Sequence, residues 1–173
     1  MLFRSKIPVG AEIAEDSPRG AALRQRITDT IYGERFDREY DMQGATLGYR
    51  YEGSPIVVPD GTPEPPDESM HYLPTARPGH RAPHAWLADG TSTLDLFGRE
   101  FTLLRTGPSP AAADSLVAAA KQQGVPLVVR DVGDAAIARL YERRLVLVRP
   151  DGHVAWRGDT DPADAAEIGR AHV

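Results

Sequence analysis

From residue 100 onward, short aliphatic runs alternate with segments of helical spacing. Four of the runs predict strands, at Glu100–Arg105, Val125–Arg130, Leu145–Val148 and His153–Trp156. Helices are predicted at Pro110–Gln123, at Asp134–Tyr141 and from Asp161 onward. Because Val125–Arg130 is almost entirely apolar, we expect both of its faces to be buried.

The resulting order is β-α-β-α-β-β-α. The first β-α-β unit requires a parallel crossover with a right-handed connection, and the last two strands form an antiparallel hairpin around Pro150-Asp151-Gly152. A mixed sheet covered by helices in this order is the thioredoxin-like arrangement. The predicted fold class is therefore α/β, a thioredoxin-like mixed sheet preceded by an appendage of one helix and one strand.

The appendage is predicted from local signals. Ser17-Pro18 is a helix start, and apolar residues follow at helical spacing until Gly33. A charged connector is expected at Asp37–Asp41, and alternation at Leu47–Tyr51 predicts a short strand. The Pro-rich and Gly-rich segment Gly53–Pro66 predicts a surface loop.

We place the domain boundary in that loop. Residues 1–66 are expected to be a linker of helix, strand and loop, and residues 67–173 the thioredoxin-like domain. Within the second part, His84–Leu87 and Ser92–Phe97 are predicted strands around the turn Asp89-Gly90.

The two ends of the chain have an unusual coding property. Residues 1–5 and residues 168–173 can be encoded by the two orientations of a common sequencing-library adapter. We therefore expect these residues to be an artefact and the natural protein to lie between them. A native start codon at Met1 and a native stop codon after Val173 in the source genome would contradict this expectation.

Composition narrows the possible functions. The 173 residues carry a net charge of −5 without a Lys/Arg run, which argues against nucleic acid or an anionic membrane as partner. Cysteine is absent, which excludes thiol catalysis, thiolate-bound zinc and iron–sulfur clusters. Since no apolar run has the length of a membrane span or a signal peptide core, we expect a cytoplasmic protein.

A thioredoxin-like sheet raises the question of redox activity. Active members of that fold carry Cys-x-x-Cys between the first strand and the first helix, where this chain has Thr106-Gly107-Pro108-Ser109. They also carry a cis-proline before the third strand, where Arg143 and Arg144 stand here. We therefore predict a redox-inactive domain.

No cofactor or metal motif is recognisable. His80 and His84 have a metal-ligand spacing, but Pro83 between them prevents a regular helix, so we expect no metal site. Gly44-x-x-x-Gly48 is not a phosphate loop, and no Gly-x-Gly-x-x-Gly occurs, so we expect no nucleotide site and no catalytic residue.

The densest cluster of unusual residues runs from Arg77 to His84. Its prolines stiffen the backbone and its arginines offer donors. One interpretation is a rigid entry into the domain, held by Arg81. The other is a docking surface for another domain, with Arg77, Arg81, His84 and Trp86 as the candidate contact residues.

Several motifs in the right order carry a family resemblance. Pro78-Gly79-x-Arg81-Ala82-Pro83-His84-x-Trp86-Leu87, Ser92-Thr93-Leu94-Asp95-Leu96-Phe97-Gly98 and Phe101-Thr102-Leu103-Leu104 resemble the C-terminal domain of FAD-dependent aromatic hydroxylases of the para-hydroxybenzoate hydroxylase fold. Leu47–Tyr51 with Ser54-Pro55 is similar to the segment before that domain, and Leu147–Arg157 to its closing hairpin.

This resemblance implies a fragment of a longer enzyme. The parent would bind FAD, use NAD(P)H and O₂, and hydroxylate a phenolic or polyketide-like ring, with all of that machinery before residue 6. Residues 1–66 would remain from the preceding FAD/substrate domain. The rest of that domain, in the same polypeptide, would be the partner of this chain. A homodimer is also possible. The fragment would be inactive, without cofactor, and structural. The alternative is a free-standing, redox-inactive thioredoxin-like module that binds a protein partner.

Overall fold

The computed structural model describes residues 10–33 and 42–170, and the chain divides into two compact units, Met1–Met42 and Gln43–Val173. The division lies after Met42, inside the segment expected to be linker. The predicted connector at residues 37–41 lies outside the described residues, as do residues 1–5 and 171–173.

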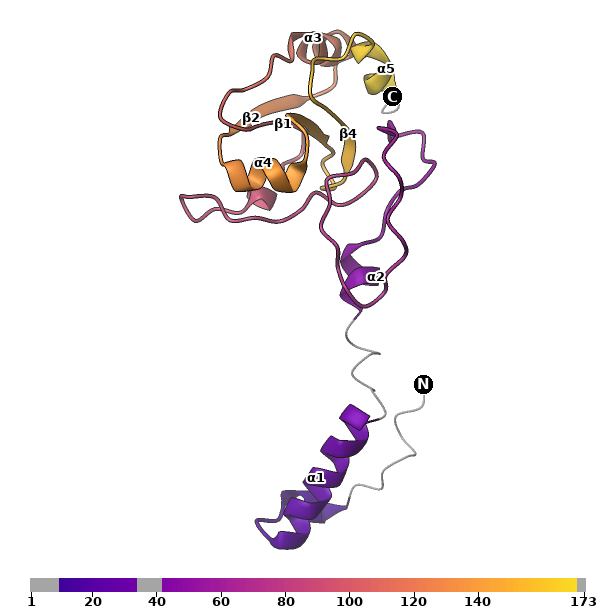
Figure 1. The fold of residues 1–173 in the computed structure, drawn as a ribbon, viewed down its shortest axis with the longest axis vertical. Coiled ribbons are helices and arrows are strands. Elements are labelled where there is room, and N and C mark those ends of the chain that lie inside the picture. Colours follow the sequence, from indigo (N-terminus) through magenta and orange to yellow (C-terminus); the bar gives the residue numbers. More distant parts are fainter. Residues whose placement is uncertain (1–9, 34–41, 171–173) are drawn as a thin grey trace. The chain divides into compact units, whose positions relative to one another are not determined.

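The first unit contains a short 3-10 helix η1 (Ala11–Ala14) and helix α1 (Pro18–Gly33), as Figure 1 shows. The predicted start is confirmed, because the Ser17 hydroxyl accepts a hydrogen bond from the backbone N–H of Gly20 (3.1 Å). Arg24 fixes η1 to α1 by donating to the carbonyl oxygens of Ile13 and Glu15. The apolar face of α1 remains partly open: Ile31 and Tyr32 are exposed.

The second unit is built on a four-stranded sheet of order β2-β1-β3-β4. The strands are β1 (Phe101–Thr106), β2 (Leu127–Val132), β3 (Leu145–Val148) and β4 (Val154–Gly158). Strand β1 pairs with β2 in parallel and with β3 antiparallel, and β3 pairs antiparallel with β4. The predicted mixed sheet is therefore confirmed, with the element order expected from the sequence.

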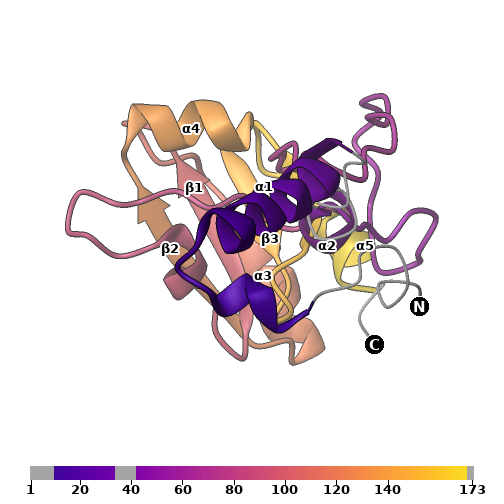
Figure 2. The ribbon, with the colours of Figure 1, turned by 90° about the horizontal axis from the view of Figure 1, so that it is seen from below.

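Helices cover both faces of this sheet. Helices α3 (Asp114–Gln123) and α5 (Ala165–Arg170) lie side by side on one face, and α4 (Ala135–Tyr141) lies on the other (Figures 1 and 2). Successive side chains of the central strands point to opposite faces of the sheet, so the same strands contribute to a hydrophobic core on each face. Leu103 and Leu147 face α3 and α5, whereas Leu104 and Val146 face α4 and a loop from residues 76 to 97.

Strand β2 differs from the prediction that it would be buried on both faces. It is an edge strand, and Leu127, Val128 and Val129 are only half-buried while Arg130 and Asp131 are exposed. Apolar composition alone does not distinguish a central strand from an edge strand, because both carry β-branched residues. The two exposed charges are typical of an edge that is protected from pairing with other chains.

The segment from Gly44 to Tyr51 also departs from the prediction. Helix α2 (Gln43–Leu47) stands where the short strand was expected to begin. The helix packs closely on residues 68–71, since a Cβ at Gly44 would lie 1.9 Å from the carbonyl oxygen of Glu68. Gly44 is therefore required for close backbone approach, which periodicity cannot reveal.

The strands predicted at His84–Leu87 and Ser92–Phe97 reduce to a single bridge between Trp86 and Ser92. The turn at Asp89-Gly90 is confirmed: Leu87 N–H donates to the Thr91 carbonyl (2.8 Å). Residues Thr93–Leu96 instead form a 3-10 helix, η3. Its first turn is held by a capping box: the Ser92 hydroxyl accepts a hydrogen bond from the Leu94 N–H (3.0 Å), and the Asp95 carboxylate accepts one from the Ser92 N–H (2.9 Å).

The helix predicted to start at Asp161 begins later, at Ala165. Asp161 acts elsewhere: its carboxylate accepts hydrogen bonds from the backbone N–H groups of Ser115 (2.7 Å) and Leu116 (3.3 Å) in the first turn of α3. A carboxylate at a helix N-terminus satisfies free donors and complements the helix dipole. The side chain that caps α3 thus comes from the segment preceding α5.

Candidate functional site

The structure separates the four candidate contact residues into two groups. Arg77 belongs to an internal network: its guanidinium donates to the Thr62 carbonyl (3.2 Å) and to the Glu64 carboxylate (3.2 Å). Arg81 is half-buried and its backbone bridges to His153. The Arg77 side chain therefore joins loops of its own unit, whereas Arg81 takes part through its backbone.

His84 and Trp86 lie at the surface. Their rings form an edge-to-face pair with centroids 4.8 Å apart, and Trp86 is 68% exposed. An exposed aromatic pair on an ordered loop is typical of a contact surface, since aromatic side chains are enriched at interfaces. The docking interpretation therefore rests on His84 and Trp86 and not on the two arginines.

The segment after β1, where active members of the thioredoxin-like fold carry Cys-x-x-Cys, is held by hydrogen bonds to the segment before β3. Thr106 donates from its hydroxyl to the carbonyl oxygen of Arg143 (2.6 Å), and Arg144 donates to the carbonyl oxygen of Ser109 (3.0 Å). The chain has no cysteine. These polar side chains join the two loops by hydrogen bonds where a redox member of the fold has its dithiol.

His80 and His84, whose spacing in the sequence is that of metal ligands, lie in different surroundings. His80 is 5% exposed, whereas His84 is exposed and packs on Trp86. Among residues 10–33 and 42–170, no group of three or more metal-ligating side chains could hold an ion. Within the same described ranges, no helix is both long and apolar enough to cross a membrane.

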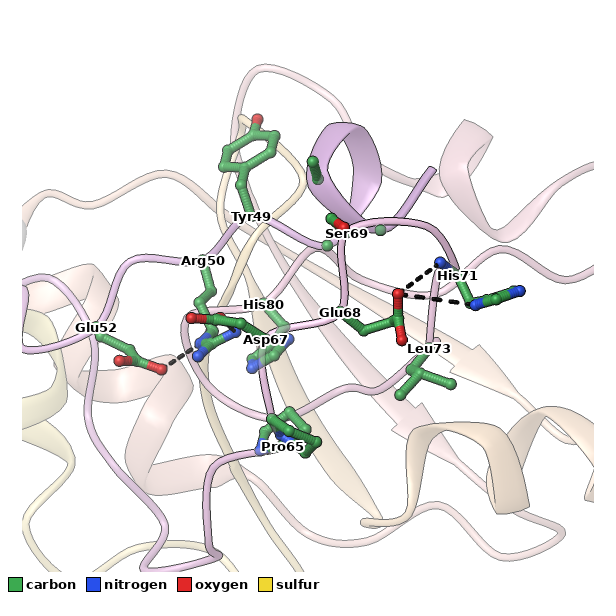
Figure 3. Close-up of a pocket in the computed structure, with 14 residues that line it drawn as sticks. Tyr49, Arg50, Glu52, Pro65, Asp67, Glu68, Ser69, His71, Leu73 and His80 are labelled. Carbon is green, nitrogen blue, oxygen red and sulfur yellow. Dashed lines mark hydrogen bonds and ion pairs between the residues drawn. The ribbon is translucent and has the colours of Figure 1, made fainter. Parts of the chain in front are cut away.

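Sequence reasoning missed a cavity of about 430 Å³ in the second unit, shown in Figure 3. One wall comes from α2 and the residues after it, the other from the loop 65–73, and His80 also lines the space. The wall residues used below are Tyr49, Arg50, Glu52, Asp67, Glu68 and Leu73. We call this space the α2 cavity.

Carboxylates outnumber cations in the α2 cavity. Arg50 lies between Glu52 and Asp67, with its Nη1 2.8 Å from the Asp67 carboxylate and its Nε hydrogen-bonded to Glu52 (Figure 3). Glu68 accepts hydrogen bonds from the backbone N–H groups of Met70 (2.8 Å) and His71 (3.4 Å), and these hydrogen bonds lower its pKa. The residues that line the cavity thus include three carboxylates and one guanidinium, and the charge of Arg77, which lies outside the lining, also acts on Glu52.

His80 lines the cavity on the side where the charges of arginines act on it. Burial lowers its pKa from 6.5 to about 4, and the positive charges of Arg50 and Arg77 act in the same direction. Its Nε2 has no hydrogen-bond partner within the described part of the chain. The ring is therefore neutral at pH 7 and leaves one buried polar atom unsatisfied.

A second histidine, His153, packs against the two tyrosines of the segment 49–51. The ring of His153 lies 5.0 Å from the ring of Tyr49 and 4.7 Å from that of Tyr51. Arg149 lies over the Tyr51 ring at 5.3 Å, and Tyr51 N–H donates to the Gly79 carbonyl (3.0 Å). These contacts set the position of one wall of the α2 cavity.

Comparison with known proteins decides the family. Residues 75–172 match the family described as aromatic-ring hydroxylase, C-terminal. The chain is 34% identical to the FAD-dependent monooxygenase opdD of Penicillium oxalicum, with 92% of the chain and 31% of the relative covered. It is also 34% identical to the 2,4-dichlorophenol 6-monooxygenase of Cupriavidus pinatubonensis, with 88% and 28% covered.

The chain belongs to the aromatic-ring hydroxylase C-terminal family. A solved structure of RebC-10x, native and bound to K252c, agrees, with a TM-score of 0.74 and 41% identity over 95% of this chain and 31% of that one. The resemblance inferred from the sequence motifs is confirmed. The chain spans about a third or less of the length of these relatives.

Most of the α2 cavity lies outside the segment that matches the family. Most of its wall lies at residues 44–73, before the matched segment 75–172, and only His80 lies within it. The residues of the cavity do not fit the pyrophosphate of FAD, because three carboxylates would repel the phosphates and no glycine-rich loop presents backbone N–H groups. No catalytic step is therefore assigned to this cavity.

The buried histidines predict a pH dependence of stability. Burial lowers the pKa of His153 as well as that of His80. The unfolded chain therefore binds more protons than the folded chain below about pH 6.5, and the free energy of unfolding should fall as the pH is lowered from about 6.5 to about 4. Urea unfolding at a series of pH values measures the slope.

The variant His80→Asn should reduce this slope, because it removes one of the two titrating groups. The control is Leu103→Ala, which removes no titratable group and should lower the free energy of unfolding by a similar amount at every pH in that window. An unchanged slope in His80→Asn would show that His80 is already protonated or solvated in the folded chain.

Proposed function

We propose that the chain is the non-catalytic, structural C-terminal part of an FAD-dependent aromatic-ring monooxygenase. In this proposal the longer polypeptide binds FAD, is reduced by NAD(P)H and uses O₂ to hydroxylate a phenolic or polyketide-like ring. The observation that carries the proposal is the match of residues 75–172 to the hydroxylase C-terminal family, in a chain that covers only 28–31% of its monooxygenase relatives.

The described residues support a structural role. The position of the thioredoxin dithiol is held by hydrogen bonds of Thr106 and Arg144, and the α2 cavity does not fit a dinucleotide. What the second unit does offer is a rigid, well-packed body with an exposed aromatic pair, His84 and Trp86. We propose that this pair contacts the preceding FAD/substrate domain or a second copy of the enzyme.

A chimera tests the proposal. The C-terminal region of the 2,4-dichlorophenol 6-monooxygenase of Cupriavidus pinatubonensis is replaced by residues 6–173 of this chain. We expect the purified chimera to contain FAD and to oxidise NAD(P)H in the presence of 2,4-dichlorophenol, whereas this chain alone contains no flavin. A chain that purifies with bound flavin by itself would overturn the structural assignment.

The same chimera tests the contact surface. Trp86→Ala should lower the thermal stability of the chimera more than that of the isolated chain, where the side chain is already 68% exposed. Val117→Ala, which changes another exposed apolar residue on helix α3, away from this loop and from the α2 cavity, serves as the comparison. If Trp86→Ala lowers the melting temperature by the same small amount in the chimera and in the isolated chain, Trp86 is not part of the interface.

A second candidate function is a free-standing, redox-inactive thioredoxin-like module that binds another protein. The exposed His84–Trp86 pair favours it, because such a surface also suits a separate partner. The genomic sequence upstream discriminates between the two: an in-frame FAD-domain coding sequence supports the hydroxylase, and its absence supports the module.

A further inference from the structure

We propose that the α2 cavity is a socket for one lysine or arginine side chain that belongs to the preceding part of the longer hydroxylase polypeptide. The inference rests on the proposed function, because it assumes that this part exists. It adds to the proposed function a specific contact between the two parts of the polypeptide, in which a cationic side chain binds the carboxylates of the cavity.

The charges of the cavity favour a cation. Arg50 pairs with both Glu52 and Asp67, and Arg77 also acts on Glu52, but Glu68 contributes a third negative charge and Asp67 has no second cation beside it among the lining residues. The Asp67 side chain is 93% exposed and that of Glu68 is 41% exposed, so both can accept further hydrogen bonds from an incoming group. Charge-assisted hydrogen bonds to carboxylates are the strongest that an ammonium or guanidinium group makes.

His80 provides a second and independent indication of a ligand. It is 5% exposed and lines the cavity, and its Nε2 has no hydrogen-bond partner in the described ranges. Leaving such an atom unsatisfied is costly, and a donor from an occupant would satisfy it after a small side-chain shift. Because the ring is neutral at pH 7, it does not repel a cation.

The remaining walls suit a long side chain more than a hydrated ion. Tyr49 and Leu73 are 49% and 54% exposed, and Pro65 and Pro66 line the same space (Figure 3). Lysine and arginine carry an apolar stem that packs on such walls while the charged head group reaches carboxylates. A tyrosine ring also attracts a cation. A metal ion would need ligands arranged within bonding distance, and the described residues provide no such group.

The occupant is assigned to the longer polypeptide because the chain covers only 28–31% of these relatives. The relatives have roughly 70% of their length outside the region that this chain covers. The cavity walls at residues 44–73 directly precede the family domain, on the side of the chain where the remainder of a relative would continue. A side chain supplied in this way would bury the exposed Tyr49 and Leu73 together with the carboxylates.

The first test uses the isolated chain and two small probes. N-acetyl-arginine amide carries the guanidinium, and N-acetyl-citrulline amide has nearly the same shape without the charge. In NMR titrations we expect the arginine probe to shift the amide signals of Arg50, Asp67 and His80, and the citrulline probe to leave them unchanged. Equal effects of the two probes, or no effect of either, would overturn the proposal.

Variants locate the binding. Asp67→Asn should weaken binding of the arginine probe about two- to fivefold, which is the effect of losing one exposed ion pair. The matched control is Asp164→Asn, which makes the same change of charge at an exposed site that lies outside the cavity. If Asp164→Asn weakens binding as much as Asp67→Asn, the probe responds to net charge and the socket is refuted.

The second test uses the chimera and identifies the occupant. A photo-crosslinking benzoylphenylalanine is placed at Leu73, and crosslinked peptides are identified by mass spectrometry. We expect peptides from the preceding part that contain lysine or arginine, and a severalfold lower yield in Asp67→Lys than in Asp164→Lys. An active, FAD-containing chimera without such crosslinks would refute the socket alone, whereas a chimera without FAD would contradict the proposed function.

Discussion

Replacing Arg157 with methionine is expected to lower the free energy of unfolding of the second unit by about 3 to 5 kcal/mol. The side chain of Arg157 is 1% exposed and donates to the carboxylates of Asp60 (2.6 Å) and Glu142 (2.9 Å). Without it, the Asp60 carboxylate, itself only 8% exposed, would remain buried without a counter-ion. That desolvation, and not the lost attraction, makes the effect large.

The free energy of unfolding at acidic pH provides a second measurement of the Arg157–Asp60 ion pair. Burial alone would raise the pKa of Asp60, but hydrogen bonds from Thr62 and Arg157 outweigh it and lower the pKa to about 2. Asp60 therefore contributes stability that is present above about pH 3.8 and is lost as the pH falls towards 2. In Arg157→Met this loss should be smaller, because the counter-ion that lowers the pKa is absent.

Two controls separate burial from charge. Arg105 makes a bidentate contact with Asp131 (2.6 and 2.9 Å), but both side chains are substantially exposed, so Arg105→Met should cost only a small part of what Arg157→Met costs. The double variant Asp60→Asn/Arg157→Met should recover part of the loss, since no buried charge remains. Urea unfolding followed by circular dichroism measures all of these variants.

Local signals in the sequence predicted the elements that depend on neighbours along the chain. Asp134 accepts hydrogen bonds from Ala136 and Ile137 at the start of α4, and Gly124 ends α3 in a left-handed conformation (φ 68°), both as expected. The fold class followed from the order of such elements, and the family followed from motifs between residues 47 and 157.

Contacts between distant residues could not be predicted in the same way. Arg157 and Asp60 are separated by 97 positions, and Asp161 caps a helix 46 positions away. In the sequence both residues are ordinary surface-type charges. The α2 cavity depends on Gly44, which allows a close approach of two backbones that no periodicity encodes. The natural ends of the protein and the boundary at residue 66 remain predictions.

The second large effect is the loss of stability caused by truncating a leucine in the central strand β1, compared with the same change in the edge strand β2. Leu103→Ala, at a residue that is 0% exposed in the central strand β1, should lower the free energy of unfolding by about 2 to 5 kcal/mol. Leu127→Ala makes the same chemical change in β2, against the same core, but at a half-buried side chain. Its cost should be clearly smaller, because less apolar surface is lost from the core and solvent can fill the space.

Comparison of these two variants also tests whether β2 is an edge in solution. Equal losses would mean that Leu127 is buried more deeply than in the single chain, which requires a second molecule on the outer side of β2. In that case the cost of Leu127→Ala would depend on protein concentration, whereas the cost of Leu103→Ala would not. Because Arg130 and Asp131 are exposed on the same strand, pairing with a second copy would remove part of their hydration, which costs free energy. The unequal loss therefore follows from the charges of β2 as well as from its burial, and sedimentation of the unmodified chain at two concentrations measures the association directly.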